Sequence, residues 1–218
     1  MKSGTISSLT PAARYSSTIS RTWATEPIIA ACCGGFARIR SSFAYWQDIV
    51  IEHKGDRTIV GGNGFAGCSR QTLLQLLQQR CADEGVSLHF ETRVDAAAVE
   101  TRFSDSDLII VADGVNSQIR KRYEKAFGVA VEEKRNKFTW LGSTRPLDAF
   151  TFFFRETEHG HFCAHTYQYE EGASTWVIET TPECWEASGF AAMSEEESAR
   201  RLEEIFAEEL AGQGSTRG

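Results

Sequence analysis

The sequence lacks any apolar stretch of the roughly 20 residues that a membrane-spanning helix needs, and no secretory signal with an apolar core opens it. Basic residues are outnumbered, 23 to 30, and a net charge of −7 is not the basic footprint of a nucleic-acid binder. The six cysteines form no CxxC pair and no zinc spacing, and they are too sparse for a disulfide scaffold. These absences predict a reducing, cytoplasmic setting with no membrane and no nucleic-acid partner.

Motifs for nucleophilic catalysis and for nucleotide hydrolysis are missing too. No GxSxG elbow and no Walker loop occurs anywhere in the 218 residues. What the chain does have is enough apolar material for a core, since 41% of its residues are hydrophobic and 11% aromatic. A chain of this length forms one domain or two small ones.

Residues 1–34 differ in composition from the rest of the chain. Ser, Thr, Ala and Arg dominate the first 25 residues, and no acidic residue precedes Glu26. This composition is typical of an organellar transit segment. The apolar residues show no clean helical face, so we favour a disordered leader or a stretch foreign to the fold.

From Phe36 onward, strand and helix patterns alternate. Ser69 is expected to cap a helix over Gln71–Cys81, because leucines recur there at helical spacing, and Gly85 is expected to end it. The run Leu108–Ala112 is apolar throughout, as in a strand covered on both faces. This order favours an α/β fold with a largely parallel sheet. The further expected elements are strands at 48–53, 57–60 and 86–90 and a helix through Ile119, Tyr123 and Phe127.

Residues 136–181 have a different pattern, rich in aromatic and β-branched residues. Successive strands with turns such as Glu170–Gly172 are expected, forming a separate antiparallel layer. Ser194 and Glu197 have the spacing of a capping box at the start of a last helix. The predicted strands are 137–141, 150–155, 161–169 and 174–180, and the apolar stripe of the last helix is Ala199, Leu202, Ile205, Phe206 and Leu210.

A GxGxxG sequence at residues 62–67 matches the fingerprint of a dinucleotide-binding loop. The expected acidic residue, about 20 positions further on, is not there; Glu91 lies at the end of the next predicted strand, farther along the chain. The motif by itself is a weak signal. We favour a glycine-rich loop that is shaped for another reason.

Residues 113–120, with the sequence DGVNSQIR, carry a stronger signal. Gly114 permits a tight turn after a predicted buried strand, and Ser117 is placed to cap the next helix. Arg120 would lie one turn into that helix, where it could reach a phosphate or a carboxylate. Ligands of open α/β sheets bind at the carboxyl ends of strands, so a binding loop and an ordinary strand–turn–helix corner are both open readings.

Three histidines and a cysteine alternate along one predicted strand: His159, His161, Cys163 and His165. A strand would direct all four to one side. Such neighbours seldom converge on one metal ion, and no ligand from another strand is evident. We therefore favour a pocket wall or a hydrated sheet face over a zinc site, and predict no metal.

The DGVNSQIR stretch resembles the Asp-Gly motif of the FAD-dependent aromatic monooxygenases, the class of para-hydroxybenzoate hydroxylase. The segments FAYWQDIVIEHKG, GGNGFAGCSRQTLLQLLQQRC, FTWLGSTRPLDAFTFFFRETEHGHFCAH and STWVIETTPECWEASG are similar to the branch containing salicylyl-CoA 5-hydroxylase and 2-aminobenzoyl-CoA monooxygenase. The resemblance runs from about residue 36 to residue 212.

This resemblance implies a mixed α/β (α+β) fold in which a partial, Rossmann-like FAD/NAD(P)-binding domain carries an inserted, antiparallel, β-rich substrate domain. It implies hydroxylation of an aromatic ring or an aromatic acyl-CoA, with FAD as cofactor, NAD(P)H as reductant and O2 as co-substrate. Asp113, Gly114, Ser117 and Arg120 would bind the cofactors, as would Arg70, while His165 and Tyr167 would face the substrate. The implied division is a leader at 1–34, an FAD-binding domain at 35–130, a substrate domain at 131–192, and a helix with a tail at 193–218.

Two elements of the family pattern are not found in this sequence. The family opens with a GxGxxG strand–turn–helix unit for the ADP half of FAD, and it carries a Gly-Asp motif beyond the last helix; here the one Gly-Asp is Gly55-Asp56, in another context. We therefore expect a chain truncated at both ends that binds FAD poorly unless a partner or a homodimer completes the site. The alternative is a non-catalytic remnant that binds an aromatic or acyl-CoA ligand or a protein partner.

Overall fold

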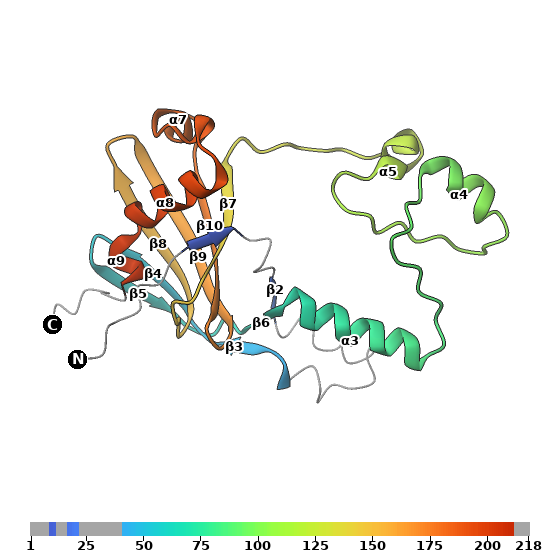
Figure 1. Cartoon of the computed structure of the whole chain (residues 1–218), viewed down its shortest axis with the longest axis horizontal. Coiled ribbons are helices and arrows are strands. Elements are labelled where there is room, and N and C mark those ends of the chain that lie inside the picture. Colours follow the sequence, from blue (N-terminus) through green and yellow to red (C-terminus); the bar gives the residue numbers. More distant parts are fainter. Residues whose placement is uncertain (1–8, 12–16, 22–40, 212–218) are drawn as a thin grey trace. The chain divides into compact units, whose positions relative to one another are not determined.

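The structure is a computed structural model that describes residues 9–11, 17–21 and 41–211 (Figure 1). Two compact units divide the chain, one formed by residues 1–86 with 135–218 and the other by residues 87–134. The strands are β1 Leu9–Pro11, β2 Ser17–Arg21, β3 Ala44–Trp46, β4 Ile49–His53, β5 Asp56–Val60, β6 Phe65–Ser69, β7 Lys137–Ser143, β8 Phe150–Thr157, β9 Gly160–Glu170 and β10 Ala173–Thr180. The helices are α3 Arg70–Asp83, α4 Ala96–Arg102, α5 Gln118–Arg122, α6 Glu124–Phe127, α7 Pro182–Ala187, the 3-10 turn η2 Phe190–Ala192, α8 Glu195–Ile205 and α9 Ala207–Leu210.

A seven-stranded sheet forms the centre of the first unit, in the order β1-β7-β10-β9-β8-β4-β5. Strands β7 to β10 are antiparallel, which confirms the four predicted strands. The prediction that they form a separate layer is wrong, because β1, β4 and β5 extend the same sheet. Strand β4 joins them through a parallel pairing with β8, and it pairs with β5 as a hairpin. The β4–β8 pair is the one parallel pair among the described strands. The expectation of a largely parallel sheet is therefore wrong.

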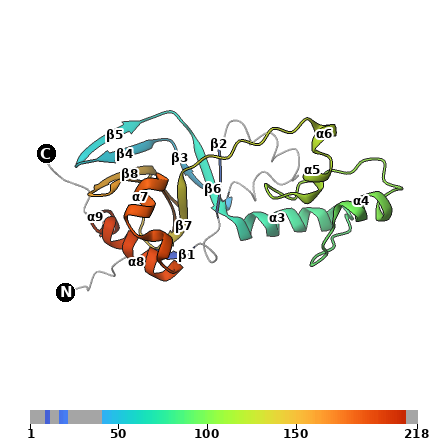
Figure 2. The same cartoon turned by 90° about the horizontal axis from the view of Figure 1, so that it is seen from above.

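Helices α7, α8 and α9 all cover the same face of this sheet (Figure 2). Trp176 at the centre of β10 is fully buried, with its ring stacked on Phe153 and edge-on to Phe206. The predicted stripe of the last helix is confirmed, since Leu202 and Phe206 are fully buried in this core. The capping box is present as predicted, because Ser194 Oγ accepts from the Glu197 N–H and Glu197 accepts from the Ser194 N–H.

A smaller sheet, β2-β6-β3, precedes helix α3. Ser69 caps this helix as predicted, since its Oγ accepts from the Thr72 N–H at 3.1 Å. The glycine run at 62–67 leads into the antiparallel strand β6 instead of directly into a helix, with positive φ at Gly62 and Gly64. This geometry differs from the strand–turn–helix unit in which a GxGxxG fingerprint binds a dinucleotide.

The second unit, residues 87–134, departs from the sequence predictions. Residues 86–90 and 108–112 form no strand, and apolar side chains such as Phe90 and Ile110 are 63% and 81% exposed. An apolar run becomes a buried strand only where neighbouring strands pair with it, and no described residue pairs with either segment. The expected single helix through Ile119, Tyr123 and Phe127 is divided into α5 and α6.

The predicted leader at residues 1–34 lies mostly outside the described residues. Within it the structure describes β1, paired with β7, and β2, paired with β6. The predicted division of the chain at residues 34, 130 and 192 stays a prediction about the complete fold.

Candidate functional site

The side of the seven-stranded sheet opposite the helices is only partly covered by the residues that the structure describes, and we call it the open face. Cross-strand pairing sets its residues, because directly opposite residues share a face: Trp140 pairs with Val177, Val177 with His165, and His165 with Phe152. The next row along the strands consists of Phe138, Glu179, Cys163 and Phe154. Phe138, Trp140 and Phe154 remain 64%, 38% and 39% exposed.

One end of the open face is closed by a second hydrophobic cluster. Tyr167 and Phe150 stack with ring centroids 5.7 Å apart, and Trp46 from β3 meets the Tyr167 ring edge-on at 5.5 Å. Contacts continue outward from Phe150 to Phe152 at 5.1 Å and from Phe152 to His165 at 4.7 Å. A continuous row of rings therefore runs from the buried cluster to the exposed part of the face, which suits a flat aromatic ligand.

Both predicted substrate residues lie on the open-face side of β9, but in different surroundings. Tyr167 is 3% exposed and belongs to the buried cluster. The His165 side chain is 31% exposed, and its Nε2 lies 3.9 Å from Glu179 Oε2. Burial lowers the pKa of His165 from its ordinary value, while Glu179 opposes this shift. The imidazole is therefore neutral near pH 7.

Cys163 lies on the same face, opposite Glu179. Burial, assisted by the negative charge of Glu179, raises its pKa to about 11. Its thiol stays protonated near neutral pH, which makes it a poor nucleophile there. Among residues 9–11, 17–21 and 41–211, no group of three His, Cys, Asp or Glu side chains is arranged to hold a metal ion.

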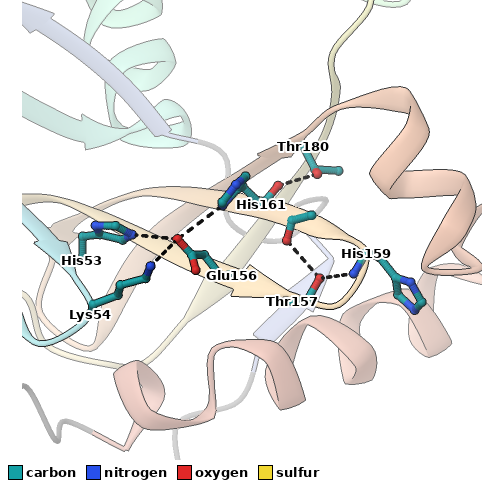
Figure 3. Close-up of polar contacts among 8 residues, drawn as sticks. His53, Lys54, Glu156, Thr157, His159, His161 and Thr180 are labelled. Atoms are coloured by element: carbon teal, nitrogen blue, oxygen red, sulfur yellow. Dashed lines mark hydrogen bonds and ion pairs between the residues drawn. The ribbon is translucent and has the colours of Figure 1, made fainter.

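A polar cluster lies at the other end of these strands (Figure 3). The Glu156 Oε1 atom is 2.8 Å from Lys54 Nζ, 3.4 Å from His53 Nε2 and 3.9 Å from His161 Nδ1. The hydrogen bond from Lys54 is the largest cause of the lowered pKa of Glu156. These exposed contacts join the β4–β5 turn to strands β8 and β9, so we assign His161 to this cluster and not to the centre of the open face.

The DGVNSQIR residues surround a cavity of about 240 Å³ in the second unit. Ser117 caps α5 by accepting from the Arg120 N–H at 2.9 Å, and the Arg120 guanidinium donates to the carbonyls of Gly114 and Val115. Gly114 has φ +89°, and a Cβ added there would meet no atom within 4 Å. The capping role of Ser117 is confirmed. The cavity is lined by Val111, Asp113, Gly114, Ser117, Arg120, Phe127 and Val129.

The structure thus brings Asp113, Gly114, Ser117 and Arg120 together around one cavity. Arg70 is the exposed first residue of α3 and belongs to the other unit. Sequence reasoning missed Glu179 and Phe152 as the neighbours of His165. The alternation of side chains along β8 and β10 was the available signal. It indicated on which face of its strand each residue lies, but not which residues of neighbouring strands lie opposite one another.

Comparison with known proteins gives relatives for most of the chain, although no protein-family model matches it. Salicyloyl-CoA 5-hydroxylase from Streptomyces sp is 36% identical over 176 residues, covering 77% of this chain and 34% of that protein. Protodeoxyviolaceinate monooxygenase from Chromobacterium violaceum is 29% identical over 171 residues, covering 78% of this chain and 45% of that protein. An aryl-carrier-protein-dependent enzyme from Streptosporangium sibiricum, 3-hydroxy-4-methyl-anthranilyl-[aryl-carrier protein] 5-monooxygenase, is 31% identical over 141 residues, which is 65% of this chain and 38% of that protein.

Solved structures agree at the level of the fold. PqsL from Pseudomonas aeruginosa, described as a probable FAD-dependent monooxygenase, superposes with a TM-score of 0.63 at 17% identity, covering 92% of this chain and 61% of that one. PqsL in complex with 2-aminobenzoylacetate gives a TM-score of 0.60 at 19% identity, covering 94% and 62%. The mixed α/β fold class and the resemblance to FAD-dependent aromatic monooxygenases are confirmed. The chain spans between 34% and 45% of the length of the relatives that it matches in sequence.

Proposed function

We propose that this chain is part of an FAD-dependent monooxygenase that hydroxylates an aromatic substrate, using NAD(P)H as reductant and O2 as co-substrate. The observation that carries the proposal is the open face, where a row of aromatic rings lies beside a neutral histidine in a fold similar to that of PqsL. Aromatic side chains bind flat rings by stacked and edge-on contacts. The three relatives in sequence, all named as hydroxylases or monooxygenases, support the same reaction.

We infer that the substrate is an aromatic acyl thioester. Two of the relatives are named for such substrates, one a CoA thioester and the other an acyl group on a carrier protein. The open face suits the ring of such a molecule, because Phe138, Trp140 and Phe154 are exposed on it. A thioester chain would extend away from the sheet into solvent.

For the cofactor, residues 113–120 fit part of FAD but not the whole molecule. The cavity of about 240 Å³ is smaller than the roughly 300–1,000 Å³ of sites for drug-sized ligands. Asp113, Gly114 and Ser117 would hold one portion of the cofactor there. Arg70, on α3 in the other unit, is a cofactor contact that the family resemblance alone implies. Bound FAD, once reduced by NAD(P)H, supplies the activated oxygen for hydroxylation.

The protein itself supplies orientation and exclusion of water. The buried cluster of Trp46, Phe150 and Tyr167 forms a dry end wall for the ring. The row of rings positions the substrate against the sheet. A fixed orientation of the reactants supplies a large part of the lowering of the activation free energy in such reactions. The Cys163 thiol on the open face is protonated near neutral pH, which agrees with a reaction in which the cofactor carries the chemistry.

A second candidate function follows from the state of Arg120. Its guanidinium is engaged with the carbonyls of its own loop, so the cavity offers no free cation from this residue to a cofactor phosphate. A protein that binds an aromatic or acyl-CoA ligand, or a protein partner, without FAD would show the same geometry.

We infer a cytoplasmic location for either function. We also infer that a homodimer or another partner would complete an FAD site.

An FAD titration of the purified full chain separates the two functions. A ligand that binds only the folded state raises its stability by about 2.7 kcal/mol at 100 times Kd, so melting temperature and flavin fluorescence should change together. Arg120→Leu should abolish both changes, because the Arg120 guanidinium holds the carbonyls of Gly114 and Val115 and so maintains the shape of the cavity. Arg122→Leu is the matched control, because this neighbour on α5 pairs with Glu100 outside the cavity. No FAD binding by the unaltered chain, with retained binding of benzoyl-CoA, would favour the second function.

A further inference from the structure

Strand β5 forms one edge of the seven-stranded sheet, and its outer side pairs with no strand among the described residues (Figure 2). Every residue of β5 is exposed, and the apolar Ile59 and Val60 side chains are 58% and 44% exposed. Neither a proline nor a bulge interrupts the strand, although these are common means of protecting a sheet edge. The outer side of β5 is therefore able to pair with another strand.

The turn of the β4–β5 hairpin determines which backbone groups of β5 point outward. Lys54 and Gly55 both have positive φ, at 52° and 86°, as in a two-residue type I′ turn. In such a hairpin the pair of residues next to the turn is hydrogen-bonded, and bonded pairs then alternate with unbonded ones along the strands. Arg57 and Ile59 belong to the unbonded pairs, so their N–H and C=O groups are directed away from β4 and toward the free edge.

Side chains along this edge carry charges of both signs beside an apolar residue. Arg57 lies opposite Glu52 of β4, with Nε 3.6 Å from Oε1, and both it and the Ile59 side chain lie on the same face. One position beyond the strand, a Cβ added to Gly61 would lie 3.3 Å from Asp48 Oδ1. The Asp48 carboxylate therefore lies beside the free edge, two positions from Ile59 and on the side opposite to Arg57.

A second copy of β5 complements this edge in one antiparallel register. A twofold axis through Ile59 places the two Ile59 residues opposite each other, and it places Arg57 opposite Gly61 of the second copy, beside the Asp48 carboxylate of that copy. The outward backbone groups then meet in hydrogen-bonded pairs, and opposite charges meet at both ends of the contact. An axis through Arg57 would instead set two guanidinium groups opposite each other, and an axis through Thr58 would set each guanidinium opposite an isoleucine.

We propose that two copies of this chain associate through antiparallel pairing of β5 with β5, which joins their two sheets into one continuous sheet. Because the contact is isologous, the Arg57–Asp48 ion pair forms twice, once on each side of the axis. The two exposed Ile59 side chains cover each other between these ion pairs. This inference goes beyond the proposed function, since the contact requires neither FAD nor an aromatic substrate.

Sedimentation velocity of the purified full chain over a range of concentrations tests the contact. We expect a species of twice the mass of the chain to increase with concentration. Ile59→Pro removes an outward N–H but no hydrogen bond to β4, so it should weaken association about tenfold and leave the hairpin intact. Ile110→Lys is the matched control, because Ile110 is an 81% exposed isoleucine of the other unit, and this variant should associate as the unaltered chain does.

Two charge reversals test the register. Arg57→Asp and Asp48→Arg should each weaken self-association about tenfold, because like charges then face each other. A mixture of the two variants should associate again, since each chain then meets the opposite charge on its partner. A monomeric unaltered chain at all concentrations would overturn the proposal, as would unchanged association of Ile59→Pro or loss of association in Ile110→Lys. A mixture that associates no better than its separate components would overturn it too.

Discussion

Arg155 on β8 connects the sheet to helix α9, and its replacement tests how much this connection stabilises the fold. Its Nε lies 2.7 Å from Glu209 Oε1, and its Nη2 donates to Glu208 Oε2. The Arg155 and Glu209 side chains are 28% and 13% exposed, so this pair lies between a surface ion pair and a buried one. Exposed pairs contribute about 0.2–1 kcal/mol, whereas removing one partner of a buried pair costs about 3–5 kcal/mol.

We therefore expect Arg155→Met to lower the free energy of unfolding by about 2 kcal/mol, because it leaves the Glu209 carboxylate buried without its cation. For a chain of this size that corresponds to a fall in Tm of about 4–8 °C. Thermal unfolding followed by near-ultraviolet circular dichroism measures it. Arg201→Met is the control: Arg201 pairs with Glu204 on the exposed side of α8, with both side chains well exposed, and should change Tm little.

The pH dependence of this loss identifies its cause. Burial raises the pKa of Glu209 above its ordinary value, with Arg155 opposing the shift. For a carboxyl whose folded pKa is raised, ionisation disfavours the folded state, so its penalty grows above the unfolded pKa and disappears as the pH falls below it. Without Arg155 the folded pKa rises further. The loss in Arg155→Met should therefore be smaller at pH 5 than at pH 7.5.

A second substitution provides the refutation. Glu209→Gln removes the buried charge and leaves Arg155 bound to Glu208, so it should destabilise less than Arg155→Met. Adding Glu209→Gln to Arg155→Met should restore part of the lost stability at pH 7.5. An equal loss at both pH values, or no restoration in the double variant, would show that Arg155 acts through the packing of its aliphatic chain and not through the ion pairs.

Trp176→Ala should cost about 3–5 kcal/mol in a denaturant titration, because this side chain is fully buried and packs on Phe153 of β8 and on Phe206 at the junction of α8 and α9. Ser194→Ala removes one half of the capping box, and Tm measurements should show a loss of about 1 kcal/mol. Cys68 and Cys163, each with a pKa raised by burial to about 11, should react with iodoacetamide at pH 8 far more slowly than a free cysteine peptide, as peptide mapping can show. Backbone amides of residues 108–112 should exchange with deuterium faster than those of β9, because no described strand pairs with these residues.

Elements whose evidence is local in sequence were predicted well. Ser69 and Ser194 were assigned as helix caps from a hydroxyl followed by a helical pattern, and both accept the expected backbone N–H. The four strands within 137–180 were predicted from their aromatic and β-branched residues and from the turns between them. Capping and strand composition depend on residues only a few positions apart, so a single sequence contains the necessary information.

Features that depend on distant segments were not predicted. The parallel pairing of β4 with β8 joins residues about a hundred positions apart, and nothing within either segment specifies it. The error at 108–112 has the same origin. Its apolar composition predicts a buried strand, but a strand is buried only where other strands flank it. The described residues supply no such strand, and Leu108 and Ile110 remain 77% and 81% exposed.

The site combines both kinds of information. That His165 lies on one face of β9 with Cys163 follows from alternation within a single strand. That Glu179 lies beside it follows only from the register of β10 against β9, which sets Val177 opposite His165. A slip of one residue would turn Glu179 toward the helices, where Trp176 and Ile178 now fill the core. The core residues of β10 therefore fix the position of the carboxylate on the opposite face, so the packing that stabilises the sheet also assembles the His165–Glu179 pair.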